Sequence, residues 1–355
     1  MSVFLYTGGL SMVRKSGVGQ AILHQKAVLE LAGVPTAEHW REAPGIVHIN
    51  TVFPGSVLAA VWARLSGRRV VCYGHSTMED FRCSFRGSNL LAPLFRQWIR
   101  FCYSLGDVVL TPTEYARTVL TSYGLRRPIY SISNGVDTAF FSPNPVRGAA
   151  FRRKYGLGPE DRAVISVGHL MERKGILEFI QLARRMPAVR FFWFGHTPRE
   201  LIPAAVREAL DGAPENLTFP GYVEPAELRD AYCGADAFVF LSHEETEGIV
   251  VLEALACGVP TILRDIPVYR GWLRHGRDVY KVRDAEETTV ILSGLLQKTL
   301  PDLTAAGRAV AESRSFQAVG QRLLEIYAAE GLLPLAESPS RPRFSALPSP
   351  VHGKP

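Results

Sequence analysis

Short apolar segments alternate with helix-like segments through residues 163–264, and this alternation limits the possible folds more than any other feature. The expected strands are almost entirely apolar, whereas strands with one face in water alternate apolar and polar side chains. A parallel sheet with helices on both faces is therefore predicted. The expected strands are 163–168, 189–195, 217–223, 236–242 and 261–264. The expected helices are 176–185, 198–211, 225–233 and 249–257.

The first 145 residues repeat this alternation less regularly, with expected helices that include 19–32, 56–66, 91–103 and 114–123. A chain of 355 residues exceeds one ordinary hydrophobic core, so two domains are expected. We predict an α/β fold of two Rossmann-like, doubly wound domains facing a cleft, joined by a proline-rich linker at 142–148. The predicted units are an N-terminal domain (1–143), a C-terminal domain (144–315), a helix able to pack back on the N-terminal domain (316–332) and a disordered tail (333–355).

The net charge of +6 belongs to the first half of the chain. Residues 1–145 contain 14 Lys or Arg and 8 Asp or Glu, whereas residues 146–355 contain 26 of each. A negatively charged partner should therefore meet the first half. The uncharged run 43–63 contains His, Asn, Pro and Gly, so a strand, a turn and a helix are expected there instead of a membrane span.

Cysteine usage and the N-terminus predict a cytoplasmic protein. The five cysteines are scattered and include no Cys-x-x-Cys pair, which argues for reduced thiols and against a zinc site. The N-terminus has no basic segment before its apolar stretch, so no signal peptide is expected.

The segment 241–260 carries the strongest functional pattern. An acidic loop follows the expected strand, Gly248 opens a helix, and Glu245 and Glu253 are eight residues apart. A carboxylate can accept two hydrogen bonds from neighbouring sugar hydroxyls, and the amides at the start of the helix suit a phosphate. The alternative is that the acidic residues only cap the helix, which leaves Glu253 unexplained.

Three further segments stand where strands are expected to end. Arg173 and Lys174 follow one strand and could neutralise a diphosphate. Gly17 and Gly19 lie between the first strand and a helix, where a backbone can approach a phosphate closely. His75 follows the strand 70–73 and is either structural or a contact to substrate.

Several other chemistries are excluded by missing motifs. The glycine loop lacks the third glycine of the dinucleotide fingerprint, and no Walker loop, zinc-protease helix or Gly-x-Ser-x-Gly elbow is present. No Asp-x-Asp pair is available to hold a metal with a nucleotide diphosphate, so a divalent metal is not expected to be required. No RNA- or DNA-binding motif accompanies the basic half, which disfavours nucleic acid as a partner.

In this order, these motifs resemble the retaining GT-B glycosyltransferases of family GT4, over about residues 1–330. The Gly-x-Gly loop, the His after a strand, 132–137 (ISNGVD), Lys174-Gly175 and the Glu245/Glu253 pair all match. Longer segments are similar to the bacterial 1,2-diacylglycerol 3-glucosyltransferases. These segments are 75–82 (HSTMEDFR), 85–98, 171–176, 245–256 and 264–272. In one departure, His169 stands where many family members have Arg.

The resemblance implies a role for each matching residue. UDP-glucose would be the donor, with its diphosphate on Lys174 and its ribose on Glu253. The residues expected at the reacting centre are His75, Lys174 and Glu245. The residues expected to bind the donor are Gly17, Gly19, Arg173, Lys174, Gly248, Ile249, Val250 and Glu253. The family also implies retention at the anomeric carbon by front-face attack.

A diacylglycerol acceptor requires contact with a membrane, and residues 81–103 interleave aromatic and basic side chains. Such a helix can lie among lipid headgroups, although a core helix with snorkelling arginines would give the same pattern. The residues expected to bind the membrane are Arg82, Arg86, Phe95, Arg96, Trp98 and Arg100.

The sequence hypothesis is thus a peripheral enzyme on the inner face of the cell membrane that glucosylates diacylglycerol, with anionic lipids as partners. The alternatives are a GT4 enzyme with another donor or a soluble acceptor, and a nucleotide-sugar- or lipid-binding protein without turnover.

Overall fold

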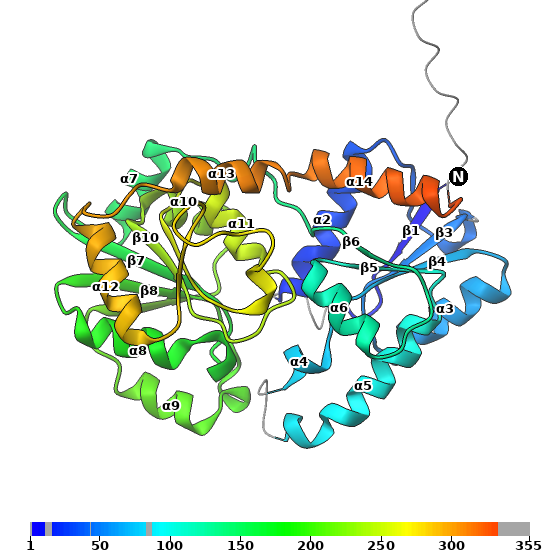
Figure 1. Cartoon of the computed structure of the whole chain (residues 1–355), viewed down its shortest axis with the longest axis horizontal. Coiled ribbons are helices and arrows are strands. Elements are labelled where there is room, and N and C mark those ends of the chain that lie inside the picture. Colours follow the sequence, from blue (N-terminus) through cyan, green and yellow to red (C-terminus); the bar gives the residue numbers. More distant parts are fainter. Residues whose placement is uncertain (1, 11–15, 43, 83–86, 333–355) are drawn as a thin grey trace, which may run out of the picture.

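The computed structural model describes residues 2–10, 16–42, 44–82 and 87–332, and each half of the chain forms a six-stranded parallel sheet (Figure 1). The first sheet, in the order β2-β1-β3-β4-β5-β6, contains β1 (Val3–Tyr6), β2 (Thr36–Ala37), β3 (Ile46–Ile49), β4 (Arg69–Tyr73), β5 (Val108–Thr111) and β6 (Ile129–Ser131). The second, in the order β12-β11-β10-β7-β8-β9, contains β7 (Arg162–Val167), β8 (Val189–Phe194), β9 (Leu217–Gly221), β10 (Ala237–Phe240), β11 (Thr261–Arg264) and β12 (Tyr280–Val282). This architecture confirms the predicted doubly wound α/β fold.

Helices cover both faces of the first sheet, because successive strand residues point to opposite sides. One face packs on α2 (Gly17–Leu31) and α14 (Phe316–Ala329). The other packs on α3 (Pro54–Leu65), α5 (Ser88–Ser104) and α6 (Glu114–Ser122). Val71 belongs to the first of these cores and Cys72 to the second. The short helix α4 (Met78–Phe81) joins β4 to the region of α5.

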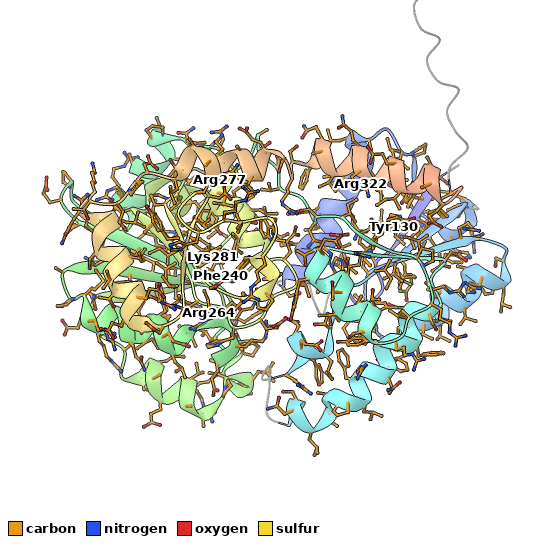
Figure 2. The ribbon with its side chains drawn as sticks, in the orientation of Figure 1. Tyr130, Phe240, Arg264, Arg277, Lys281 and Arg322 are labelled. Atoms are coloured by element: carbon orange, nitrogen blue, oxygen red, sulfur yellow. The ribbon has the colours of Figure 1, made fainter. Side chains whose placement is uncertain are left out.

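The second sheet is enclosed in the same way. One face packs on α8 (Ile176–Arg185), α9 (Ala204–Asp211) and α12 (Ala285–Leu296). The other packs on α7 (Pro145–Lys154), α10 (Pro225–Gly234), α11 (Ile249–Ala256) and α13 (Thr304–Glu312). Phe240, labelled in Figure 2, ends β10 within this second core.

After α13 the chain returns to the first half, where α14 packs beside α2 (Figure 1). Phe316, Leu323 and Tyr327 are buried in the core of the first half. Figure 2 labels Tyr130 of β6 in this region, and its hydroxyl donates a hydrogen bond to the carboxylate of Glu330. The helix α14 therefore packs as part of the first half of the structure.

Two details of the predicted elements were wrong. The helix predicted over 198–211 is broken into a 3-10 turn (Arg199–Leu201) and α9, because Pro203 has a fixed φ and no N–H. The predicted linker 142–148 already contains the start of α7, since Asn144 accepts hydrogen bonds from Val146 N and Arg147 N and Pro145 suits the first helical position. The domain boundary at 143/144 stays a prediction, and the predicted disordered tail lies outside the described residues.

The uncharged run 43–63 contains β3 and most of α3, which confirms the predicted strand, turn and helix. Among the described residues, each helix is too short or too polar to cross a bilayer.

Candidate active site

A cavity of about 290 Å³ lies between the two halves, beyond the carboxyl ends of the strands of the second sheet. The loops after β7, β8, β9 and β10 and the start of α11 form one wall. The start of α2 and the side chains of His75 and Asp80 form the opposite wall. The cavity thus occupies the place where doubly wound sheets bind their ligands.

Lys174 and Glu245 form an ion pair inside this cavity, between Nζ and Oε1. Lys174 ends the 3-10 turn Glu172–Lys174 after β7, and Glu245 follows β10. β7 and β10 are neighbouring strands, so the two loops that follow them lie side by side. Burial acts to raise the pKa of Glu245, but the cations of Lys174 and Arg173 outweigh it and hold this pKa below its usual value.

Glycine is required on both sides of this ion pair. Gly175 has φ +79°, and a Cβ there would lie 2.4 Å from the carbonyl oxygen of Leu241. Gly248 has φ +87° as the N-cap of α11. These two glycines allow the basic loop and the start of α11 to approach the end of β10 closely.

Glu253 lies on the second turn of α11, 3% exposed, and lines the same cavity. The hydroxyl of Tyr232 donates to its Oε2 at 3.1 Å. Burial raises the pKa of Glu253 to about 7, so the carboxylate form becomes dominant only above neutral pH. Ile249 and Val250, the first two residues of α11, line the cavity beside it, where the positive end of the helix dipole favours an anion.

His75 is 6% exposed and stacks on Tyr73 with ring centroids 5.7 Å apart. Its Nε2 lies 3.2 Å from Oδ1 of Asn50, which is itself held by Gln25. Because that oxygen can only accept, the contact selects the Nε2-protonated tautomer and leaves Nδ1 as an acceptor. Burial lowers the pKa of His75 to about 4, so the ring is neutral at physiological pH.

The acidic loop binds the first half of the chain instead of capping α11. Glu244 Oε1 accepts a hydrogen bond from Tyr115 at 2.7 Å, and the carbonyl of Thr246 accepts one from Thr113 at 2.8 Å. Glu247, 1% exposed, accepts hydrogen bonds from the backbone and side-chain nitrogens of Asn134 at 2.9 and 2.8 Å. The N-cap of α11 receives no side-chain hydrogen bond, so the helix-capping alternative is wrong.

Two family models match the chain. Residues 27–140 match Glycosyltransferase Family 4, and residues 149–298 match Glycosyl transferases group 1. The chain is also 36% identical, over 328 residues, to the processive diacylglycerol alpha-glucosyltransferase of Acholeplasma laidlawii, a match that covers 92% of this chain and 98% of that one. The chain belongs to glycosyltransferase family 4.

A second sequence relative and two solved structures are also similar to this glycosyltransferase. It is 24% identical to the alpha-galactosylglucosyldiacylglycerol synthase of Streptococcus pneumoniae, over 81% of this chain and 78% of the relative. The HepE protein of Anabaena, solved with UDP-glucose, superposes with a TM-score of 0.72 at 16% identity, over 92% of this chain and 99% of that one. Sucrose-phosphate synthase from Thermosynechococcus elongatus gives a TM-score of 0.70 at 18% identity, over 88% and 79% of the two chains. These structures confirm the predicted GT-B fold.

In this glycosyltransferase, the side chain of Arg173 binds one acceptor group from each half of the chain. Its guanidinium pairs with Asp80 of α4 at 2.7 Å and donates to the carbonyl of Glu244 at 2.7 Å, and its side chain is 9% exposed. The predicted contact with a diphosphate would have to compete with Asp80. Asp80 was not among the predicted site residues, although it lies in the HSTMEDFR segment that carries the resemblance.

His169 lies in the cavity with Nδ1 3.0 Å from the carbonyl oxygen of His196. Burial lowers its pKa, so His169 supplies no positive charge at neutral pH. Among the described residues that line the cavity, Arg173 and Lys174 are therefore the cations, and each is paired with a carboxylate.

Gly17 lines the cavity as the first residue of α2, so the glycine pair lies within the first helical turn and not in a loop. Ser16 caps this helix by accepting from Gly19 N at 3.4 Å. The positive end of α2 therefore faces the cavity opposite that of α11.

The predicted membrane residues separate into two groups. Phe95 is half-buried and stacks on Phe81 with centroids 4.1 Å apart, and Arg96 donates to the carbonyl of Ser122 at 3.0 Å. Arg82, Trp98 and Arg100 are exposed, and Arg86 lies outside the described residues. The core-helix alternative explains Phe95 but not the exposed apolar side chains of α5.

Proposed function

We propose that this glycosyltransferase transfers glucose from UDP-glucose to the 3-hydroxyl of 1,2-diacylglycerol at a membrane surface, with retention at the anomeric carbon. One observation carries the proposal: the similarity to the Acholeplasma diacylglycerol alpha-glucosyltransferase spans nearly the whole of both chains. The cavity supports the proposal, because the carboxylates of Glu245 and Glu253, the cations of Arg173 and Lys174, and the N-termini of α2 and α11 all line one space.

The donor assignment rests on charge and hydrogen-bonding capacity. Lys174 and the start of α11 hold the diphosphate, and Glu253 accepts hydrogen bonds from the two ribose hydroxyls. As the diphosphate binds Lys174, Glu245 loses part of its ion pair and its carboxylate becomes available to the glucose hydroxyls. The HepE complex with UDP-glucose shows that a chain of this fold can hold such a donor.

In the transfer step, the 3-hydroxyl oxygen of diacylglycerol bonds to the anomeric carbon while the bond from that carbon to the β-phosphate oxygen breaks. The departing phosphate takes the hydroxyl proton, so UDP and the glucoside are the products. Lys174 stabilises the negative charge that develops on the phosphate. Nδ1 of His75 accepts a hydrogen bond from a sugar hydroxyl and so fixes the orientation of the sugar ring.

The decisive experiment incubates the purified chain with labelled UDP-glucose and diacylglycerol in mixed micelles that contain anionic lipid. We expect a glucosyl-diacylglycerol whose anomeric proton shows the α configuration by NMR. Transfer to a soluble acceptor alone, or UDP binding without transfer to any acceptor, would contradict the proposal and favour one of the two alternatives. A product with two sugars would show that the enzyme also uses its own product.

A further inference from the structure

Two free cysteines of the second half lie next to each other beside the helix that carries Glu253. Cys233 belongs to the last turn of α10, and Cys257 is the residue directly after α11. The helices α10 and α11 pack against each other (Figure 1). The two thiols are hydrogen-bonded to each other. The structure therefore holds two reduced sulfur atoms in direct contact, at the ends of two packed helices.

The surroundings of Cys233 favour its thiolate form, which is the nucleophilic and oxidisable form of cysteine. The hydrogen bond from Cys257 lowers the pKa of the Cys233 thiol, and this effect outweighs burial. The backbone N–H of Asn144 and the cation of Arg229 lower this pKa further, whereas the charge of Asp230 acts against them. The same hydrogen bond, together with burial, raises the pKa of Cys257, which therefore stays a thiol. Cys233 is half-buried, so a small oxidant in water can reach it.

Two cysteines of the first half, Cys72 and Cys102, have different surroundings. Sγ of Cys72 donates to the backbone carbonyl of Cys102 at 3.9 Å, so its partner is a peptide oxygen and not a thiol. Burial raises the pKa of both thiols to about 12, so both stay protonated and unreactive at neutral pH. Among the described cysteines, Cys233 is therefore the one whose pKa is lowered.

Both helices of the cysteine pair also take part in the contact between Tyr232 and Glu253. Tyr232 directly precedes Cys233 in α10, and its hydroxyl donates to Glu253 Oε2 at 3.1 Å. Cys257 lies one turn after Glu253, and its backbone N–H donates to the carbonyl of Glu253 at 3.0 Å. A covalent bond would draw the two sulfur atoms to about 2 Å, well inside hydrogen-bond distance. The ends of α10 and α11 would have to shift, and the contact between Tyr232 and Glu253 would shift with them.

We propose that Cys233 and Cys257 form a redox-modification site, which a peroxide converts into an intramolecular disulfide. The thiolate sulfur of Cys233 attacks one oxygen of hydrogen peroxide, the O–O bond breaks and hydroxide leaves, so that a sulfenic acid forms. The sulfur of Cys257 then attacks the sulfenic sulfur, the S–O bond breaks, and the displaced hydroxide takes the proton of Cys257 and leaves as water. In total, the two thiols lose two hydrogens and two electrons, and one peroxide becomes two waters.

The disulfide should weaken nucleotide binding, a consequence that rests on the proposed function because that function assigns Glu253 to the ribose. The hydrogen bond from Tyr232 lowers the pKa of Glu253. When the shift of α10 weakens this hydrogen bond, the protonated carboxyl of Glu253 becomes more populated, and it accepts hydrogen bonds less well than the carboxylate. Oxidation of the cysteine pair is thus expected to lower the affinity for UDP, and reduction of the disulfide is expected to restore it.

The modification is tested by peptide mapping of the full chain after treatment with hydrogen peroxide. The remaining thiols are alkylated in denaturant before digestion, so the result does not depend on activity. We expect a disulfide-linked peptide pair in which Cys233 is joined to Cys257. Cys257→Ser should stop at a sulfenic acid on Cys233, trapped by dimedone, whereas Cys102→Ala, the matched control, should form the same disulfide as the unchanged chain. Absence of this linked pair, or preferential oxidation of Cys72 and Cys102, would overturn the proposal.

The consequence for the nucleotide is tested by calorimetry with UDP before and after oxidation. We expect the Kd for UDP to rise about three- to tenfold in the oxidised chain and to return to its first value after reduction with dithiothreitol. The UDP affinity of Cys257→Ser, which cannot form the cross-link, should not change. A chain that contains the disulfide but has unchanged UDP affinity would overturn the link to Glu253. Failure of the proposed function looks different: the disulfide forms, but the reduced chain neither binds UDP nor transfers glucose.

Discussion

The two halves share one architecture but differ in where their apolar and charged residues lie. In the second half, helices on both faces bury the sheet, and acidic and basic residues are equal in number over 146–355. In the first half, α3 and α5 keep one apolar side in water, and basic residues exceed acidic ones by six. Under the proposed function, the two halves would serve two partners: groups at the strand ends would hold a small anionic donor in the cavity, and helix surfaces would meet a bilayer.

The largest expected effect is at Lys174. Lys174→Met should lower kcat about 10²- to 10³-fold, because the leaving phosphate loses its nearest cation. The double variant Lys174→Met/Glu245→Gln should be little worse than the single one, since the two groups act as a pair. Steady-state kinetics checks both, with Lys154→Met as a control on an exposed lysine of α7. Additive losses would show that Lys174 and Glu245 act independently.

A smaller loss is expected for the basic flank of the first half. Each arginine near an anionic bilayer contributes about 1 kcal/mol, and Arg96 is already engaged by Ser122 and Tyr123. Neutralising Arg82, Arg86, Arg96 and Arg100 to Gln should therefore weaken vesicle binding about 100-fold at low salt. UDP affinity, measured by calorimetry, should not change. A parallel loss of UDP affinity would contradict the proposal that the first half binds the membrane and the second half binds the donor.

Substitution of Glu253 should change the affinity for UDP and leave vesicle binding unchanged. Glu253→Ala should raise the Kd for UDP about 30-fold, through the loss of two hydrogen bonds to ribose. Because burial raises the pKa of Glu253 to about 7, protonation below that pH removes an acceptor, and UDP affinity should rise between about pH 6 and pH 8. The hydrogen bond from Tyr232 lowers the pKa of Glu253, so its loss in Tyr232→Phe should raise this pKa and move the rise in UDP affinity to higher pH. A pH profile identical in Glu253→Gln would refute the assignment.

The smallest expected effect concerns the contact between the halves. Asp80→Asn leaves Arg173 without its carboxylate partner, so we expect about a tenfold fall in kcat/KM for diacylglycerol. UDP affinity should hold or improve, because Arg173 is released toward the diphosphate. Asp137→Asn, at a turn that does not line the cavity, serves as the matched control. Weaker UDP binding in Asp80→Asn would show that Asp80 supports the donor instead.

The sequence predicted the second half well because its strands are short, apolar and separated by clear turns. The residues proposed to bind the donor could also be selected from the sequence, since Lys174, Glu245 and Glu253 follow strands β7 and β10, which are neighbours in one sheet. The helix break at Pro203 and the start of α7 at Pro145 were missed, although proline and the Asn144 cap mark both positions in the sequence.

Contacts between the halves were beyond the reach of sequence patterns. Asp80 and Arg173 are far apart in the chain and meet only because the two sheets face each other. The bonds from Tyr115 to Glu244 and from Asn134 to Glu247 have the same origin. The exposed apolar side of α3 was missed for a different reason: its apolar spacing also fits a core helix, and only the packing of Ala60 and Ala63 shows which side is buried.

Hydrogen exchange of the full chain, with UDP-glucose and separately with anionic vesicles, tests the division between the halves most directly. We predict that UDP-glucose slows exchange in 168–176 and at the start of α11, and that vesicles slow exchange in α3 and α5. Protection of the second half by vesicles, or no protection near α11 by UDP-glucose, would contradict the account.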